Sequence, residues 1–147
     1  MAGLKITTAR YVGVSLLLGF VLNILGWLGN VFLLGDLWDE ALVLVHDTPW
    51  RATIWRELLT LLPDFVYAFF MVRLYIYMSA TLGATFLTAL KSAMFIFVVC
   101  VATTYFAIAN SAFLPWKISI YTTILALATF IPGAWMMHRL LRDDGGD

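Results

Sequence analysis

The sequence predicts an all-α, polytopic membrane protein, with four transmembrane helices and an amphipathic interfacial helix between the first and the second. Of its 147 residues, 63% are hydrophobic and only 12% are charged, whereas charged residues make up about 25% of a soluble domain. The chain contains four long apolar runs, each near the ~20 residues that a helix needs to cross a bilayer. In none of these runs do apolar and polar residues alternate as in a β-barrel strand. We therefore expect helices, whose backbone N–H and C=O groups form their hydrogen bonds within the helix, as lipid requires. The chain is short enough to form a single domain over 1–147.

The four helices are expected at about 11–34, 57–80, 85–110 and 118–137. The first run, YVGVSLLLGFVLNILGWLGNVFLL, exceeds the ~7–15 apolar residues of a signal peptide, so we expect a retained helix. The stretches SATLGAT (79–85) and NSAFLPWK (110–117) contain turn-forming residues and separate the last three helices.

The interfacial helix is expected over about 36–46, within DLWDEALVLVHDTPW. Leu37, Trp38, Leu42 and Val45 recur at helical spacing, and the acidic residues lie away from them. This helix would either cap the bundle with a solvated face or dock onto a partner protein through those four residues.

Basic residues predict the orientation of the chain. Four crossings place both ends on one side, which has more Lys and Arg than the other, so both termini are expected in the cytoplasm. The cytoplasmic set is Lys5, Arg10, Arg73, Lys91, Arg139 and Arg142, against Arg51, Arg56 and Lys117 outside.

Small and polar residues form stripes along three of the helices. The first has Ser15, Gly19, Asn23, Gly26 and Asn30; the third has Cys100, Thr103, Ala107 and Ser111; the fourth has Ser119, Thr122, Ala126, Thr129 and Gly133. Membrane helices pack through such residues. We therefore expect these stripes to face one another, the alternative being a polar pathway through the bundle.

A proline and a carboxylate, Pro63-Asp64, interrupt the apolar run LLTLLPDFVYAFF. At ~1.5 Å per residue, Asp64 would lie roughly 10 Å inward from Glu57. Ionisable residues at membrane depth are rare and usually face a bundle interior. The candidate intramembrane polar cluster is Asp64, Asn23, Thr60, Tyr67, Thr104 and Tyr105.

Two readings of this stretch remain open from sequence. The second helix is either continuous and kinked at Pro63, or it begins at Pro63 after a separate interfacial helix. Asp64 is accordingly a hydrogen-bonded joint between helices or a group that handles ions.

No catalytic residues, cofactor site or metal site are predicted. His46 and His138 would lie on opposite sides of the membrane, each at the surface. The lone Cys100 is expected to act as a small hydrophobic residue. No basic run is long enough for nucleic acid.

The pattern LLGFVLNILGWLGNVFLLGDLWDEA, with GAWMMHRLLR at the end of the last helix, resembles small bacterial four-helix membrane proteins, which implies the bacterial inner membrane. The expected function is a non-catalytic accessory or structural subunit, with membrane lipid and other membrane subunits, or further copies of itself, as partners. The alternatives are a small proton- or cation-coupled transporter or channel that uses Asp64, and a lipid- or quinone-modifying enzyme.

Overall fold

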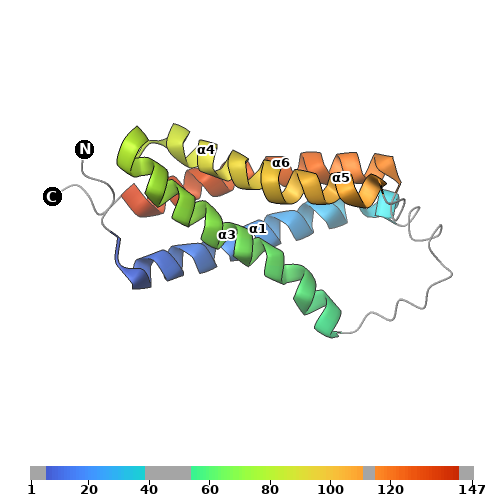
Figure 1. Cartoon of the computed structure of the whole chain (residues 1–147). Coiled ribbons are helices and arrows are strands. Elements are labelled where there is room, and N and C mark those ends of the chain that lie inside the picture. Colours follow the sequence, from blue (N-terminus) through green and yellow to red (C-terminus); the bar gives the residue numbers. More distant parts are fainter. Residues whose placement is uncertain (1–5, 39–53, 111–114, 143–147) are drawn as a thin grey trace.

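The computed structural model describes residues 6–38, 54–110 and 115–142, and for 54–60 the backbone alone. The described residues are helical and contain no strand, and four helices are long and apolar enough to cross a membrane (Figure 1). The prediction of an all-α chain with four transmembrane helices is confirmed in this form.

The first span is α1 (Thr8–Leu33) and the second is α3 (Ile54–Leu82). The third span has three parts: α4 (Phe86–Ile96), a π-helical segment η1 (Phe97–Ala102) and α5 (Thr103–Asn110). The fourth is α6 (Trp116–Arg142), which extends beyond the expected 118–137 at both ends. The sequence estimate followed apolar residues alone, whereas a helix continues through polar residues at the membrane boundary.

Local signals at two boundaries explain where helices begin and end. The side chains of Thr7 and Thr85 accept hydrogen bonds from the backbone N–H groups of Arg10 and Thr88 and so cap α1 and α4. Gly83, with φ of 82°, follows α3, and its N–H donates to the Ser79 carbonyl. A left-handed residue at this position ends a helix and reverses the chain.

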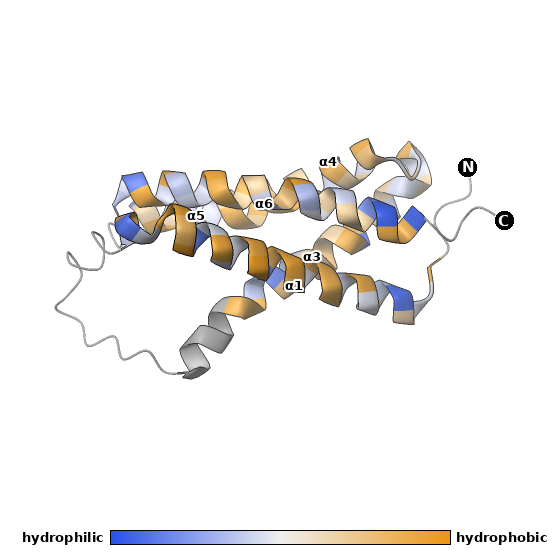
Figure 2. Ribbon diagram, turned by 180° about the vertical axis from the view of Figure 1, so that it is seen from behind, coloured by the Kyte–Doolittle hydropathy of each residue, from blue (hydrophilic) through white to orange (hydrophobic). Residues whose placement is uncertain are grey.

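The four spans run antiparallel to their chain neighbours. The start of α1, the end of α6 and the turn at Gly83 lie at one end of the bundle (Figure 1). The Arg10 guanidinium donates to the Leu140 carbonyl and joins α1 to α6 at this end. From the crossing with α1, the N-terminal half of α3 diverges from the other helices (Figures 1 and 2).

Apolar residues fill the interior of the bundle and also cover much of its exterior. Leu18, Ala68, Ala93 and Ala134 are fully buried, while Phe20, Trp27 and Phe32 on α1 are 61%, 61% and 76% exposed. Figure 2 shows hydrophobic residues along the middle of the helices and hydrophilic ones mostly toward their ends. So large an apolar exterior suits lipid or a protein partner, not water.

The interfacial helix predicted over 36–46 lies mostly outside the described residues, as do Leu42 and Val45. Residues 35–38 are helical, and Leu37 is half-buried. The Trp38 indole donates a 2.9 Å hydrogen bond to Oδ1 of Asn30. Trp38 therefore folds back onto the end of α1.

Candidate functional site

The residue pair Pro63-Asp64 lies inside a helix that continues through it. α3 runs unbroken from Ile54 to Leu82, with Pro63 inside it. The sequence left open whether the helix continues through Pro63 or begins there, and the structure shows that it continues. An interior proline cannot donate to the carbonyl four residues earlier, here that of Leu59.

The neighbours of Asp64 place it beside the middle of α1. The adjacent Phe65 packs against Gly19, where a Cβ would lie only 3.0 Å from the Phe65 Cα. The Leu61 carbonyl, one turn earlier, accepts a hydrogen bond from Asn23. Gly19 and Asn23 are central in the 26 residues of α1, so Asp64 is at membrane depth if α1 spans the bilayer.

Two of the predicted partners of Asp64 lie in its neighbourhood. Tyr67, one turn along α3, and Tyr105 on α5 are both close enough to interact electrostatically with Asp64. Cys100 is also close enough to Tyr67 to interact with it electrostatically. Asp64 itself is half-buried, and none of the described residues forms a hydrogen bond or ion pair with its carboxylate. The site therefore combines an embedded carboxylate with two phenols.

The other three members of the predicted cluster have different roles. Asn23 donates to the carbonyls of Gly19, at 2.9 Å, and Leu61, at 3.2 Å, rather than to Asp64. Thr104 is exposed, and its hydroxyl donates to the Cys100 carbonyl. The side chain of Thr60 lies outside the described part of the chain.

The π-helical segment explains why Tyr105 approaches Asp64 and Thr104 does not. Each π-turn contains more residues than an α-turn, so the residues after η1 are rotated relative to a regular helix. Thr103 and Ala107, which the sequence placed on an inward stripe, are exposed. That prediction is wrong for this helix because it assumed unbroken α-helical periodicity; Ser111 lies outside the described residues.

Asn23 joins α1 to α3, and its replacement tests that joint. Asn23→Ala is expected to lower the free energy of unfolding in mild detergent by about 0.5–1 kcal/mol, the usual contribution of a hydrogen bond between membrane helices. The matched control is Asn30→Ala, because Asn30 bonds to Gly26 of its own helix and to Trp38 and to no other described span. Equal effects of the two changes would show that Asn23 does not hold α3.

A second buried polar pair was missed by the sequence analysis. His138, expected at the surface, is 6% exposed, and its Nδ1 lies 3.0 Å from the hydroxyl of the fully buried Tyr75. The signal was present: the inward stripe of α6 passes through Gly133, and one turn further it reaches Met137 and His138. The surface prediction for His138 is wrong because this residue lies on the inward stripe, although it is close to the end of the helix.

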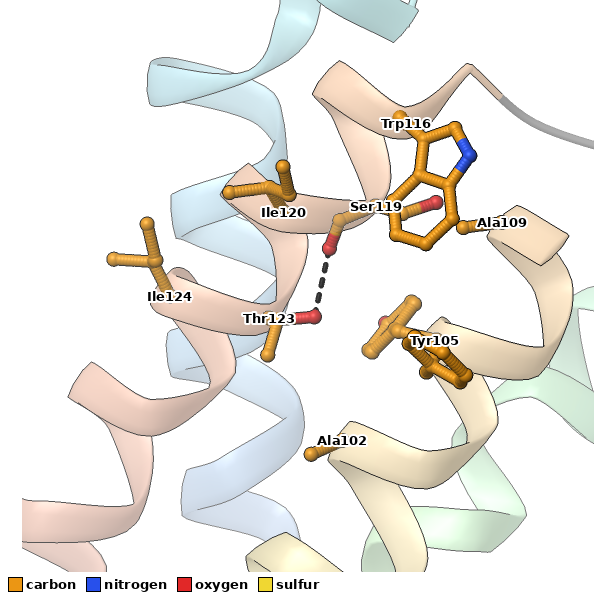
Figure 3. A pocket seen from close by; sticks show the side chains of 9 residues that line it. Ala102, Tyr105, Ala109, Trp116, Ser119, Ile120, Thr123 and Ile124 are labelled. Atoms are coloured by element: carbon orange, nitrogen blue, oxygen red, sulfur yellow. Dashed lines mark hydrogen bonds between the residues drawn. The ribbon is translucent and has the colours of Figure 1, made fainter.

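A groove of about 210 Å³ lies between α6 and the third span, toward the Trp116 end (Figure 3). Its walls are mostly apolar, and they include Tyr105, Trp116 and Ser119. Figure 3 shows the Trp116 and Ser119 side chains of α6 facing Tyr105 and Ala109 across it. The Ser119 hydroxyl is buried, and no described residue bonds to it.

Comparisons with known proteins add no functional information. No protein-family model matches the chain, and neither a curated protein nor a solved structure matches it.

Proposed function

We propose that the chain is a non-catalytic accessory or structural subunit of a larger membrane complex. The observation that carries this proposal is the position of Asp64. It is a half-buried carboxylate beside the middle of α1, where α3 diverges from the rest of the bundle.

A half-buried acid at this depth favours cover from another polypeptide. Ionisable groups inside a membrane are costly and almost always face a bundle interior, a cavity or a partner. On the same face of α3, three residues before Asp64, Leu61 is 41% exposed. A transmembrane helix of another subunit could lie along this face of α3 and supply a hydrogen-bond donor or a cation to the carboxylate.

The charges at the ends of the bundle support cytoplasmic termini, and the location that we propose is the bacterial inner membrane. Arg10, Arg139 and Arg142 belong to the end that contains the start of α1 and the end of α6. The exposed Lys117 belongs to the opposite end. The positive-inside rule then assigns the arginine-rich end to the cytoplasm.

Replacing Asp64 tests the subunit proposal. A photo-crosslinking amino acid at position 61 (Leu61 is 41% exposed) should form one defined cross-link to another membrane protein in intact membranes. Asp64→Leu should reduce its yield at least several-fold, because the partner's polar group would lose its acceptor. Asp64→Asn should retain part of it, since an amide still accepts a hydrogen bond.

The control is the same crosslinker at position 95, where Phe95 is 58% exposed on a different face, on α4. Its products should not depend on Asp64. Cross-links from position 61 that reach only lipid or a second copy of the chain would count against the hetero-complex.

A small proton- or cation-coupled transporter or channel is the second candidate. It is favoured by two phenols, those of Tyr67 and Tyr105, which lie near enough to Asp64 to interact with it electrostatically. In proteoliposomes of the purified chain, this function would give a pH-dependent flux that Asp64→Asn abolishes. A wild-type chain without flux would exclude it and leave the subunit proposal standing.

A further inference from the structure

Ser119 differs from every other buried hydroxyl residue that the structure describes. The hydroxyls of Ser15, Ser79, Ser92, Thr122 and Thr129 donate to carbonyls three or four residues earlier in their own helices, and Thr88 pairs with Thr85. Ser119 is 3% exposed, and its Oγ has no hydrogen-bond partner among the described residues. A buried donor without an acceptor costs about 1–3 kcal/mol, so a ligand that supplies the acceptor would be favoured.

The unpartnered hydroxyl faces the groove between α6 and the third span. On the wall formed by the third span, the small side chains of Ala102 and Ala109 leave room for a ligand. On the wall formed by α6, Trp116 lies above Ser119 (Figure 3). The rim is open to the outside of the bundle, because Phe106 and Ile120 are 62% and 52% exposed. An apolar chain can therefore enter sideways from the membrane.

The depth of Ser119 matches the boundary between lipid headgroups and acyl chains. Ser119 lies three residues after Trp116, the first residue of α6, or about 4–5 Å along the helix. Tryptophans gather at this boundary, where the ester carbonyls of glycerolipids also lie. Lys117, exposed on the same turn, provides a positive charge for a phosphate.

We infer that this groove binds one acyl chain of a diacyl glycerophospholipid, whose ester carbonyl accepts a hydrogen bond from the Ser119 hydroxyl. Lys117 would contact the phosphate of the same lipid. The laterally open rim and the exposed Lys117 at headgroup depth favour a lipid over a packed helix from a protein partner. The inference does not depend on the subunit proposal. It concerns the groove between α6 and the third span rather than the surroundings of Asp64 on α3, and its ligand is a lipid rather than a protein.

Diester and diether lipids test the ester contact directly. The full chain is reconstituted with equal amounts of diacyl and dialkyl phosphatidylglycerol of the same chain length, and the retained lipid is measured by native mass spectrometry. The wild-type chain should retain the diester form about fivefold better, as expected for one hydrogen bond. Ser119→Ala should reduce this preference to about one.

The matched control is Ser92→Ala, because Ser92 is equally buried but bonds within its own helix, to Ala89. It should keep the fivefold preference. A second readout uses a chain in which Trp116 is the only tryptophan: acyl chains brominated near the carbonyl should quench its fluorescence more than chains brominated near the methyl end.

Three results would overturn the inference. They are equal retention of diester and diether lipid by the wild-type chain, an unchanged preference in Ser119→Ala, and cross-linking of the groove to a second copy of the chain. The last would show that a protein helix, not a lipid, occupies the groove.

Discussion

Replacing Gly19 with alanine is expected to lower the free energy of unfolding by about 1–3 kcal/mol, the usual cost of overpacking a tight interface. A Cβ at this position would lie 2.5 Å from Cδ1 and 3.0 Å from Cα of Phe65. The Phe65 ring can rotate away, but its backbone cannot move unless α1 and α3 separate. Unfolding in mild detergent, followed by a probe of the α1–α3 distance, measures the effect.

Two other glycines of α1 serve as controls for Gly19. At Gly26 a Cβ would meet nothing within 4 Å, so Gly26→Ala should be neutral or stabilising, because alanine is the better helix former. At Gly29 the clash is with the flexible side chain of Leu125, so the loss should be smaller than at Gly19. A similar loss at Gly19 and Gly26 would show that helix propensity, not the contact with Phe65, sets the result.

Regular periodicity made much of the bundle predictable from sequence. The apolar runs indicate the four spans, and the stripe of α6 is inward as expected, with Ser119, Thr122, Thr129 and Gly133 all buried. The stripe of α1 is correct only in part. Ser15 and Gly19 are buried, whereas at Gly26 no neighbouring helix comes close and Gly29 packs against α6 instead.

The parts that the sequence did not reveal depend on departures from regular helices. The π-helical segment η1 rotates Thr103 and Thr104 outward, and no single residue in FVVCVA marks such a segment. The neighbourhood of Asp64 was predictable in part, because counting residues along the helical hairpin placed Tyr105 level with Asp64. The bond from Asn23 to the Leu61 carbonyl depends on the crossing angle of α1 and α3, which the residue pattern does not determine.

Replacing Tyr75 with alanine should have the largest effect of all, lowering the free energy of unfolding by about 3–5 kcal/mol. Tyr75 is fully buried on α3 and makes an edge contact with His138 of α6, with ring centroids 6.3 Å apart. Its removal leaves a cavity between these helices and leaves His138 Nδ1 without the phenol that lies 3.0 Å from it. The measurement is again unfolding in mild detergent.

Two variants separate the packing of Tyr75 from its hydrogen bond. Tyr75→Phe retains the ring and removes only the hydroxyl, so it should cost about 0.5–1.5 kcal/mol. Tyr77→Ala truncates the same residue type two positions along α3, where the side chain is 79% exposed, and should change stability by less than about 0.5 kcal/mol. If Tyr77→Ala were as costly as Tyr75→Ala, the exposed face of α3 would be covered in the folded protein, and stability at this end would come from a partner rather than from the contact between α3 and α6.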